Sequence, residues 1–111
     1  VVDDQVGQPT WTVDVADLVV RLVEAAAPGG AYAATSSGQT SWFGFAQRVV
    51  EAAAIDAEVR PSSSADSARP APRPAYSAMS HDSLVAAGVE PIGPWADRWA
   101  VAAAAIVGET R

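Results

Sequence analysis

The chain has 111 residues, enough for one small domain at most, and half of them are hydrophobic, although many of these are alanine. Its formal net charge of −6, with seven arginines and no lysine, argues against sequence-independent binding to nucleic acid, which depends on cations placed against phosphates. With no cysteine and one histidine, a disulfide framework, a thiolate metal site and a histidine zinc cage are excluded, and a cytosolic origin fits.

The N-terminal part is expected to form strand, loop, helix and strand in that order. Val1–Val2 is typical of the end of a strand, and residues 3–10 form a turn-rich loop. A helix follows with Thr12 as its N-cap, and Pro28-Gly29-Gly30 stops it. Residues 31–35, Ala-Tyr-Ala-Ala-Thr, are a candidate strand.

A second helix is expected after Thr40 or Ser41, either of which can cap it. Its apolar residues recur at helical spacing, beginning with Trp42 and Phe45, and these two are expected to belong to the core. Residues 55–60 are a candidate strand or extended segment. The core is expected to depend on a few large side chains, so a partner domain that covers part of it is plausible.

Residues 61–75 differ in composition from the rest of the chain. Four prolines disfavour both a helix and a central strand, so a polyproline-like extended segment is expected. Ser80 is expected to cap a short helix that Gly88 ends, and Pro94 can occupy the first turn of a last helix. That helix contains the longest apolar run, about half a membrane span, so no segment is expected to cross a bilayer.

The predicted order is β-α-β-α-β-loop-α-α, with three longer helices, one short helix and short strands. This alternation favours a small α/β layer over an all-helical bundle. Residues 1–111 are expected to form a single domain, and the sequence shows no internal repeat.

No catalytic constellation is found in the sequence. There is no glycine-rich phosphate loop, and neither Tyr32 nor Tyr76 has a lysine four positions on, as a short-chain reductase would require. His81 is expected to be an exposed residue at a helix start. Asp3 and Asp4 point to opposite sides if they are extended, so a solvated loop entry is at least as good an interpretation as a metal role.

Two segments carry chemistry suited to binding. Gln5 and Thr10 offer neutral donors and acceptors that suit a sugar or a base, although they can equally satisfy backbone groups of a strand-to-helix connector. Arg69 and Arg73 lie on a proline-stiffened backbone, and guanidinium groups match the oxygens of a diphosphate in pairs. An exposed proline-rich linker is the alternative for this second segment, and compositional bias is the alternative for the preference for arginine.

The order of these motifs resembles the C-terminal region of dTDP-4-dehydrorhamnose reductases, members of the extended short-chain dehydrogenase/reductase superfamily. The resemblance covers essentially the whole chain. Its motifs are Asp4-Gln5-x-Gly7-x-Pro9-Thr10, Gly30-Ala31-Tyr32, Thr40-Ser41-Trp42-Phe43-Gly44-Phe45-Ala46, Arg73-Pro74-Ala75-Tyr76-Ser77 and Pro94-Trp95. Tyr76 departs from the asparagine often seen before that serine, which leaves open whether this position contacts the nucleotide or packs.

The resemblance implies a two-part enzyme that reduces the 4-keto group of dTDP-4-dehydro-L-rhamnose. An N-terminal Rossmann domain, absent from this chain, would bind NADPH and supply the catalytic tyrosine and lysine, and this part would be inactive alone. The resemblance places Gln5, Pro9 and Thr10 at the substrate cleft, and Arg73 and Ser77 on the nucleotide-diphosphate side. Composition and charge favour a cytoplasmic protein that binds neither nucleic acid nor membrane, and a homodimer is compatible with the sequence.

Three alternatives remain open. The chain can belong to a related reductase acting on another dTDP-deoxysugar. It can belong to a non-catalytic homologue, as in the regulatory subunit of methionine adenosyltransferase. It can also be a stand-alone interaction domain that presents the Arg-Pro segment to a partner.

Overall fold

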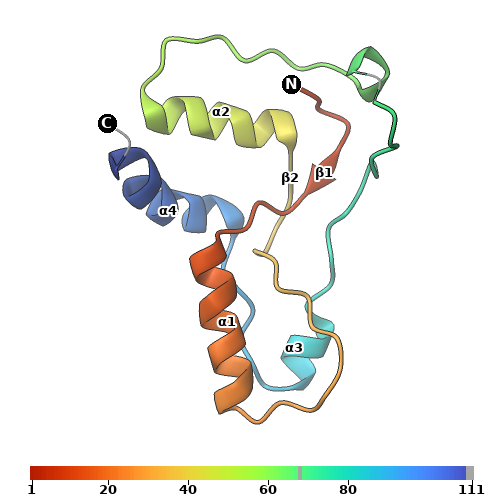
Figure 1. The fold of residues 1–111 in the computed structure, drawn as a ribbon, viewed down its shortest axis with the longest axis vertical. Helices are drawn as coiled ribbons and strands as arrows, with labels where there is room; N and C mark the ends of the chain where they lie inside the picture. Colours follow the sequence, from red (N-terminus) through yellow and green to blue (C-terminus); the bar gives the residue numbers. More distant parts are fainter. Residues whose placement is uncertain (68, 110–111) are drawn as a thin grey trace.

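Four α-helices and a two-stranded antiparallel sheet make up the regular structure in the computed structural model, which describes residues 1–67 and 69–109 (Figure 1). The sheet lies between two pairs of helices: α1 and α3 occupy one end of the molecule, and α2 and α4 the other. The predicted α/β class, with three longer helices and short strands, is confirmed. In chain order the elements are β1 (Val6–Gly7), α1 (Thr12–Glu24), β2 (Thr40–Ser41), α2 (Trp42–Ala53), the 3-10 turn η1 (Ser64–Ser67), α3 (Asp82–Ala86) and α4 (Trp95–Glu109).

The first two helices begin and end through local backbone chemistry. The residue before α1 is Trp11, extended and without a side-chain cap, so Thr12 is the first helical residue and its prediction as N-cap is wrong. The helix ends before Pro28 because Ala26 turns left-handed, with φ of 51°. At the start of α2 the Oγ of Ser41 accepts a hydrogen bond from the amide of Gly44 at 3.0 Å, which confirms the predicted cap.

The helices of the C-terminal part lie where the sequence predicts them. The N-cap of α3 is His81, without a side-chain cap, so the prediction of Ser80 as the cap is wrong, although Ser80 Oγ accepts from the amide of Asp82 at 3.1 Å. Gly88, with φ of 72°, follows the end of α3. His81 is the residue before α3, but it is half-buried and in contact with Thr35, so its prediction as exposed is wrong. Helix α4 begins at Trp95, so the helix lies where it is expected, but Pro94 precedes it and does not occupy its first turn.

The predicted strands are the main error of the sequence analysis. Residues 31–35 form no strand, and no backbone hydrogen bond joins them to another described segment. Residues 55–60, expected as a strand or an extended segment, form no strand either, although the carbonyl of Arg60 accepts from the N-terminal amine of Val1 at 2.8 Å. The sheet forms instead between β1 and β2, in the register Val6 with Ser41 and Gly7 with Thr40. Residues 69–75 carry no helix or strand, as predicted for the proline-rich segment, whereas η1 interrupts that segment earlier; Ala68 lies outside the described residues.

The buried core is small. The principal cluster, between α1 and α3, consists of Leu18, Leu84, Val89 and Ile92. Trp42 is 59 % exposed, so its prediction as a core residue is wrong. The radius of gyration is 16.0 Å, against about 13 Å for a compact domain of this length. The described residues therefore leave much apolar surface uncovered.

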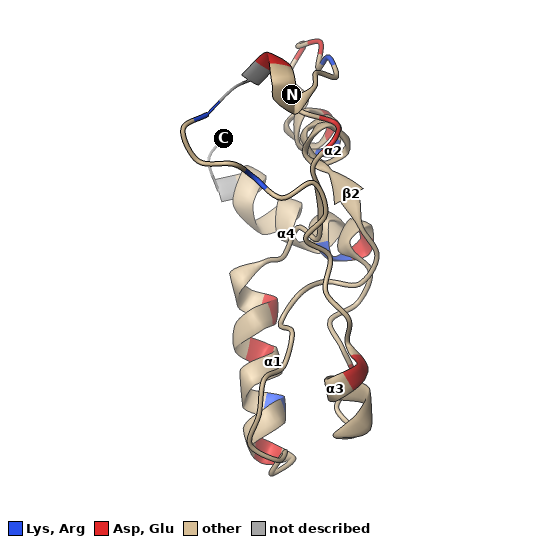
Figure 2. Cartoon of the chain, turned by 90° about the vertical axis from the view of Figure 1, so that its right-hand side faces the viewer, with Lys and Arg blue, Asp and Glu red and all other residues tan. Residues whose placement is uncertain are grey.

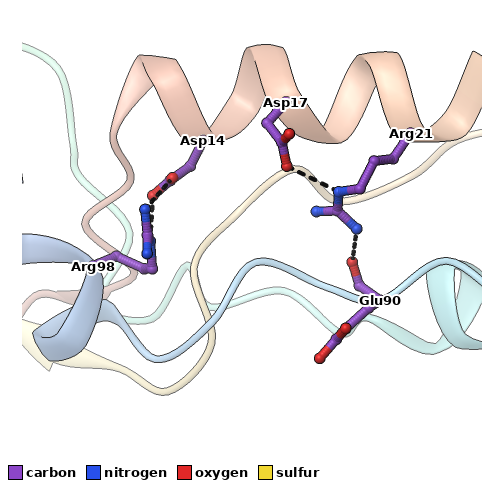
Figure 3. Close-up of polar contacts among 5 residues, drawn as sticks. All are labelled: Asp14, Asp17, Arg21, Glu90 and Arg98. Atoms are coloured by element: carbon purple, nitrogen blue, oxygen red, sulfur yellow. Dashed lines mark hydrogen bonds and ion pairs between the residues drawn. The ribbon is translucent and has the colours of Figure 1, made fainter. Parts of the chain in front are cut away.

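An ion pair joins the helices of the two ends (Figure 3). Arg98 of α4 donates from Nε to Asp14 Oδ2 at 3.0 Å and from Nη2 to Asp14 Oδ1 at 2.8 Å, a bidentate geometry. The Asp14 side chain is 10 % exposed and that of Arg98 33 %. Hydrogen bonding to the Asp14 carboxylate raises the pKa of Arg98 above its ordinary value. A second pair, Arg21 with Asp17, lies on the surface of α1.

We predict that Asp14→Asn lowers the free energy of unfolding by about 2–3 kcal/mol. Breaking a buried ion pair costs roughly 3–5 kcal/mol, and the partial exposure of Arg98 reduces that cost. Asp17→Asn is the matched control, because its surface pair is expected to contribute about 0.5 kcal/mol or less. Urea unfolding followed by tryptophan fluorescence measures both values, and equal losses for the two variants would contradict the prediction.

Candidate functional site

Strand β1 brings together the two segments that the sequence analysis singles out for binding. Val6 donates its amide to the carbonyl of Ala75 at 2.8 Å, and its carbonyl accepts from the amide of Ser77 at 2.9 Å. These bonds form a parallel bridge between Val6 and Tyr76, on the opposite edge of β1 from β2. The loop that begins at Asp4 and the segment that contains Arg73 and Ser77 therefore lie side by side, although about 70 positions separate them in the sequence.

A glycine permits this close approach. A Cβ atom on Gly7 would lie 2.9 Å from Ser77 Oγ, nearer than side-chain carbons normally come. Ser77 Oγ also donates to the carbonyl of Val6 at 3.3 Å, and the residue stays exposed. The serine hydroxyl is thus held at the edge of β1 and remains open to a ligand.

Gln5 belongs to a network anchored on Ser64. Its Nε2 donates to Ser64 Oγ at 3.0 Å, and the Ser64 hydroxyl donates to Asp4 Oδ1 at 2.6 Å. The amide of Ser64 also donates to the Asp4 carboxylate at 2.9 and 3.0 Å. These bonds from Ser64 lower the pKa of Asp4 below its ordinary value. Asp3 instead accepts from Ser41 Oγ at 2.6 Å, so the two carboxylates bind different segments.

The sequence analysis did not find this anchor. Ser64 is sixty residues from Asp4, and it lies in a serine run that looks like a linker. The contact of Gln8 with Met79 was also missed, because 71 positions separate the two residues in the sequence. The Gln8 side-chain amide accepts from the backbone N–H of Met79 at 2.8 Å and donates to the Met79 carbonyl at 3.4 Å.

Both arginines of the proline-rich segment are exposed, and no described carboxylate pairs with them. Both lie in the loop between η1 and α3. In Figure 2 the red acidic positions of α1 lie at the other end of the molecule from the blue positions of the long loop near the N-terminus. Tyr76 lies close behind them in the chain with 61 % of its surface exposed, and its hydroxyl donates to Gln39 Oε1 at 2.7 Å. Arg69 and Arg73 are thus free to meet an anion, and the segment ends in an aromatic ring fixed at its hydroxyl.

Pro9 and Thr10 lie in a different place, along a groove of about 380 Å³ beside α2 and α4. The aromatic rings in its wall include Phe45, which packs edge-to-face on Trp99 with ring centroids 5.3 Å apart. The Thr10 hydroxyl donates to the Gln8 carbonyl at 2.8 Å and accepts from a backbone amide at 3.1 Å. The groove is lined by Pro9, Thr10, Trp11, Thr12, Phe45, Trp95, Arg98, Trp99, Ala102 and Ile106.

The five residues predicted to bind substrate therefore fall into two groups. Gln5 and Ser77 flank Val6 at β1, and Arg73 precedes Ser77 on the adjoining loop. Pro9 and Thr10 belong to the groove. Their contact with a substrate stays a prediction.

Within residues 1–67 and 69–109, no three acidic or histidine side chains are grouped to hold a metal ion. The imidazole of His81 is hydrogen-bonded to the Thr35 hydroxyl at 2.9 Å. In the same residues no helix is both long and apolar enough to span a membrane.

Comparison with known proteins gives one family. The model of the RmlD substrate binding domain matches residues 1–107. A dTDP-4-dehydrorhamnose reductase of Streptomyces griseus is 47 % identical over 100 residues, which cover 86 % of this chain and 33 % of the relative. A probable dTDP-4,6-dihydroxy-2-methyloxan-3-one 4-ketoreductase of Streptomyces antibioticus is 42 % identical over 96 residues, covering 86 % and 32 % of the two chains.

A solved structure shares the fold. The dTDP-4-dehydrorhamnose reductase of Bacillus anthracis, in complex with NADP, superposes with a TM-score of 0.82 at 31 % identity. The match covers 87 % of this chain and 34 % of that protein. The chain spans about a third of the length of the relatives it matches.

The contact between Asp4 and Ser64 predicts a pH dependence of stability. Because the folded pKa of Asp4 is lowered, its stabilising contribution is fully present above the unfolded pKa and is lost as the pH falls through the folded value. Asp4→Asn should therefore lower the unfolding midpoint near neutral pH, and the difference from the unmodified chain should shrink with acidification. Thermal unfolding from near neutral pH down through the folded pKa of Asp4 measures this difference in midpoint. Ser64→Ala should lower the midpoint near neutral pH in the same way. Midpoint curves that stay parallel to that of the unmodified chain at all pH values would refute the assignment.

Proposed function

The chain belongs to the RmlD substrate binding domain family, and from this premise we propose that it binds the dTDP-sugar of a reductase that converts dTDP-4-dehydro-L-rhamnose to dTDP-L-rhamnose. One observation supports this assignment above the others. The hydrogen bonds of the Val6 amide and the Val6 carbonyl to residues 75 and 77 align the loop containing Gln5 with the segment containing Arg73 and Ser77. Neutral and cationic groups thus gather on neighbouring segments, which is the combination that a nucleotide sugar requires.

Each candidate residue has a role that follows from its chemistry. Arg73 would bind the diphosphate, because a guanidinium group presents paired donors to phosphate oxygens and this one has no carboxylate partner among the described residues. Ser77 would donate to a phosphate or ribose oxygen beside it. Gln5 would present the free part of its amide, and Pro9 and Thr10 would shape the sugar side of the cleft.

NADPH belongs to the proposal as the cofactor of the whole reductase, where it would supply the hydride. The residues of this chain do not fit its phosphates: the longer helices begin after Trp11, Ser41 and Pro94, and none of these starts is a glycine-rich strand-to-helix turn. Residues 1–111 would therefore be the substrate-binding domain, and a Rossmann domain outside them would hold the cofactor and the proton donor. This chain would contribute positioning of the sugar and exclusion of water.

A related ketoreductase acting on another dTDP-deoxysugar is the second candidate. The Streptomyces antibioticus relative, named for such a reaction, is 42 % identical and aligns over a similar share of the chain as the griseus reductase. The two candidates share the nucleotide and differ at the sugar. A cytoplasmic location and a homodimer, expected from the resemblance, also belong to the proposal.

We predict that Arg73→Ala weakens dTDP binding by about 10- to 100-fold, because hydrogen bonds to charged groups are worth roughly 1.5–3 kcal/mol. The measurement is calorimetric titration with dTDP of a full-length reductase that carries this chain in place of the matching third. Arg73→Lys should recover part of the affinity, since lysine keeps the charge without the paired donors.

Arg60→Ala is the matched control, because Arg60 is also exposed but pairs with Glu58 in another segment. It should leave the affinity within about twofold. An unchanged affinity in Arg73→Ala would remove the diphosphate role from that residue. Turnover with the two 4-keto sugars distinguishes the two candidate functions.

A further inference from the structure

We propose that Tyr76 is a positioning residue for Arg73: the bond from its hydroxyl to Gln39 attaches the segment that carries Arg73 across strand β1. The proposal deepens the proposed function and rests on it, because it takes a nucleotide sugar as the ligand of Arg73. Three observations lead to it. They are the face of the sheet on which Tyr76 lies, the support under Gln39, and the exposure of the segment around Tyr76.

Tyr76 and Ser77 lie on opposite faces of the small sheet. Tyr76 pairs with Val6 in a parallel bridge, and paired residues direct their side chains to the same face. Ser77 Oγ lies instead beside Gly7, 2.9 Å from the place of a Cβ atom there. Because successive residues of an extended chain alternate between faces, the Tyr76 ring points away from the side on which Ser77 offers its hydroxyl. A ligand bound at Ser77 therefore does not rest on the Tyr76 ring.

The Tyr76 side chain instead spans strand β1. Its hydroxyl donates to Gln39 Oε1 at 2.7 Å. Gln39 immediately precedes β2, which pairs with the other edge of β1, so the two backbones are two strand spacings apart, roughly 10 Å. Tyrosine carries its hydroxyl at the far end of a long ring, so it reaches across a strand where serine or threonine would not. Tyr76 thus connects the two outer segments over the central one.

Gln39 is a fixed support for this bond. Ser37 pairs with Pro94 in a parallel bridge, and the amide of Trp95 donates to the Ser37 carbonyl at 2.9 Å. The Trp95 indole N–H donates to the Gln39 carbonyl at 3.1 Å. Gly38 between them has a φ of 75°, and a Cβ atom there would lie 3.3 Å from the Trp95 ring. The Tyr76 hydroxyl is therefore attached to backbone that is held against the start of α4.

Burial contributes little to the position of the segment around Tyr76. Tyr76 is 61 % exposed, and residues 69–75 before it are exposed and carry no helix or strand. Its neighbours Ala75 and Ser77 are bonded to one residue, Val6, at one edge of β1. A segment paired at a single edge can rotate about that edge. The bond to Gln39 is a second attachment point, on the far side of β1, and it restricts this rotation three positions from Arg73.

The consequence for binding is preorganisation. An exposed arginine on a free segment loses backbone and side-chain freedom when it binds a diphosphate, and this loss opposes binding. The bond from Tyr76 to Gln39 restricts the segment before the ligand arrives, so less freedom is lost on binding. Pro72 and Pro74 restrict the backbone on either side of Arg73 in the same way. The affinity for the diphosphate should therefore depend on a hydroxyl group that does not touch it.

The test is calorimetric titration with dTDP of the full-length reductase that carries this chain in place of the matching third. Tyr76→Phe keeps the ring and removes the bond, and it should weaken dTDP binding about three- to tenfold. Gln39→Leu removes the acceptor and should have the same effect, and the double variant should bind no more weakly than either single variant. An unchanged affinity in Tyr76→Phe overturns the proposal.

The chain offers a matched control in its other tyrosine. The hydroxyl of Tyr32 donates to the carbonyl of Pro28 in another segment, and Tyr32→Phe should change dTDP affinity by less than about twofold. Tyr76→Ala separates positioning from direct contact. If it weakens binding more than about tenfold beyond Tyr76→Phe, the ring itself contacts the nucleotide by stacking, and the positioning role is overturned.

Dependence on Arg73 separates positioning from a general loss of stability. In the Arg73→Ala background, Tyr76→Phe should change dTDP affinity by less than about twofold, because the hydroxyl acts through Arg73. A three- to tenfold loss that persists in this background overturns the proposal.

Amide exchange at Ser77 tests the attachment without a ligand. This amide donates to the Val6 carbonyl at 2.9 Å, and Tyr76→Phe should accelerate its exchange about threefold or more, because the segment leaves β1 more often. If the reductase with the unmodified chain does not bind dTDP, the proposed function fails, while faster exchange at Ser77 still supports the attachment. If dTDP binds and Tyr76→Phe changes neither its affinity nor the exchange, the proposed function stands and the positioning role is overturned.

Discussion

The arrangement of this domain depends on the backbone of one residue, Val6. Its strand pairs with β2 on one edge and with residues 75–77 on the other, so three distant segments meet within a few ångströms. Helix α2 begins directly after β2. The Arg-Pro segment leads into residues 75–77, which pair with the other edge of β1. Backbone pairing of this kind does not depend on side-chain identity, so it sets the positions of the candidate residues around it whatever their side chains are.

The sequence predicted helices better than strands, for a physical reason. Helices form from contacts within one segment, so the cap at Ser41, the stop at Gly88 and the helix start marked by Pro94 were sufficient to locate them. A strand exists only with a neighbour, and the apolar pattern of residues 31–35 says nothing about whether that neighbour is present. Of the two residues expected as the cap of α2, Ser41 takes that role and Thr40 pairs with Gly7 in the sheet.

The candidate site was predictable in its components and not in its geometry. Chemistry and order singled out Gln5 and Arg73, and the structure shows that their segments are neighbours. Ser64 could not be found because its role depends on a contact across sixty residues within a low-complexity run. Pro9 and Thr10 were grouped with Gln5 by sequence proximity, but the chain turns between them and carries them into a separate groove.

The hydrogen bond between Tyr76 and Gln39 has an optical consequence. The carbonyl of Gln39 accepts from the indole N–H of Trp95 at 3.1 Å, while its side chain holds the Tyr76 hydroxyl. A single residue thus connects the end of the Arg-Pro segment to a chromophore at the start of α4. Movement of that segment on ligand binding would alter the polarity and hydrogen bonding around the Trp95 ring. Trp95, one of four tryptophans in the chain, would therefore report on the proposed binding loop through its fluorescence, with no label added.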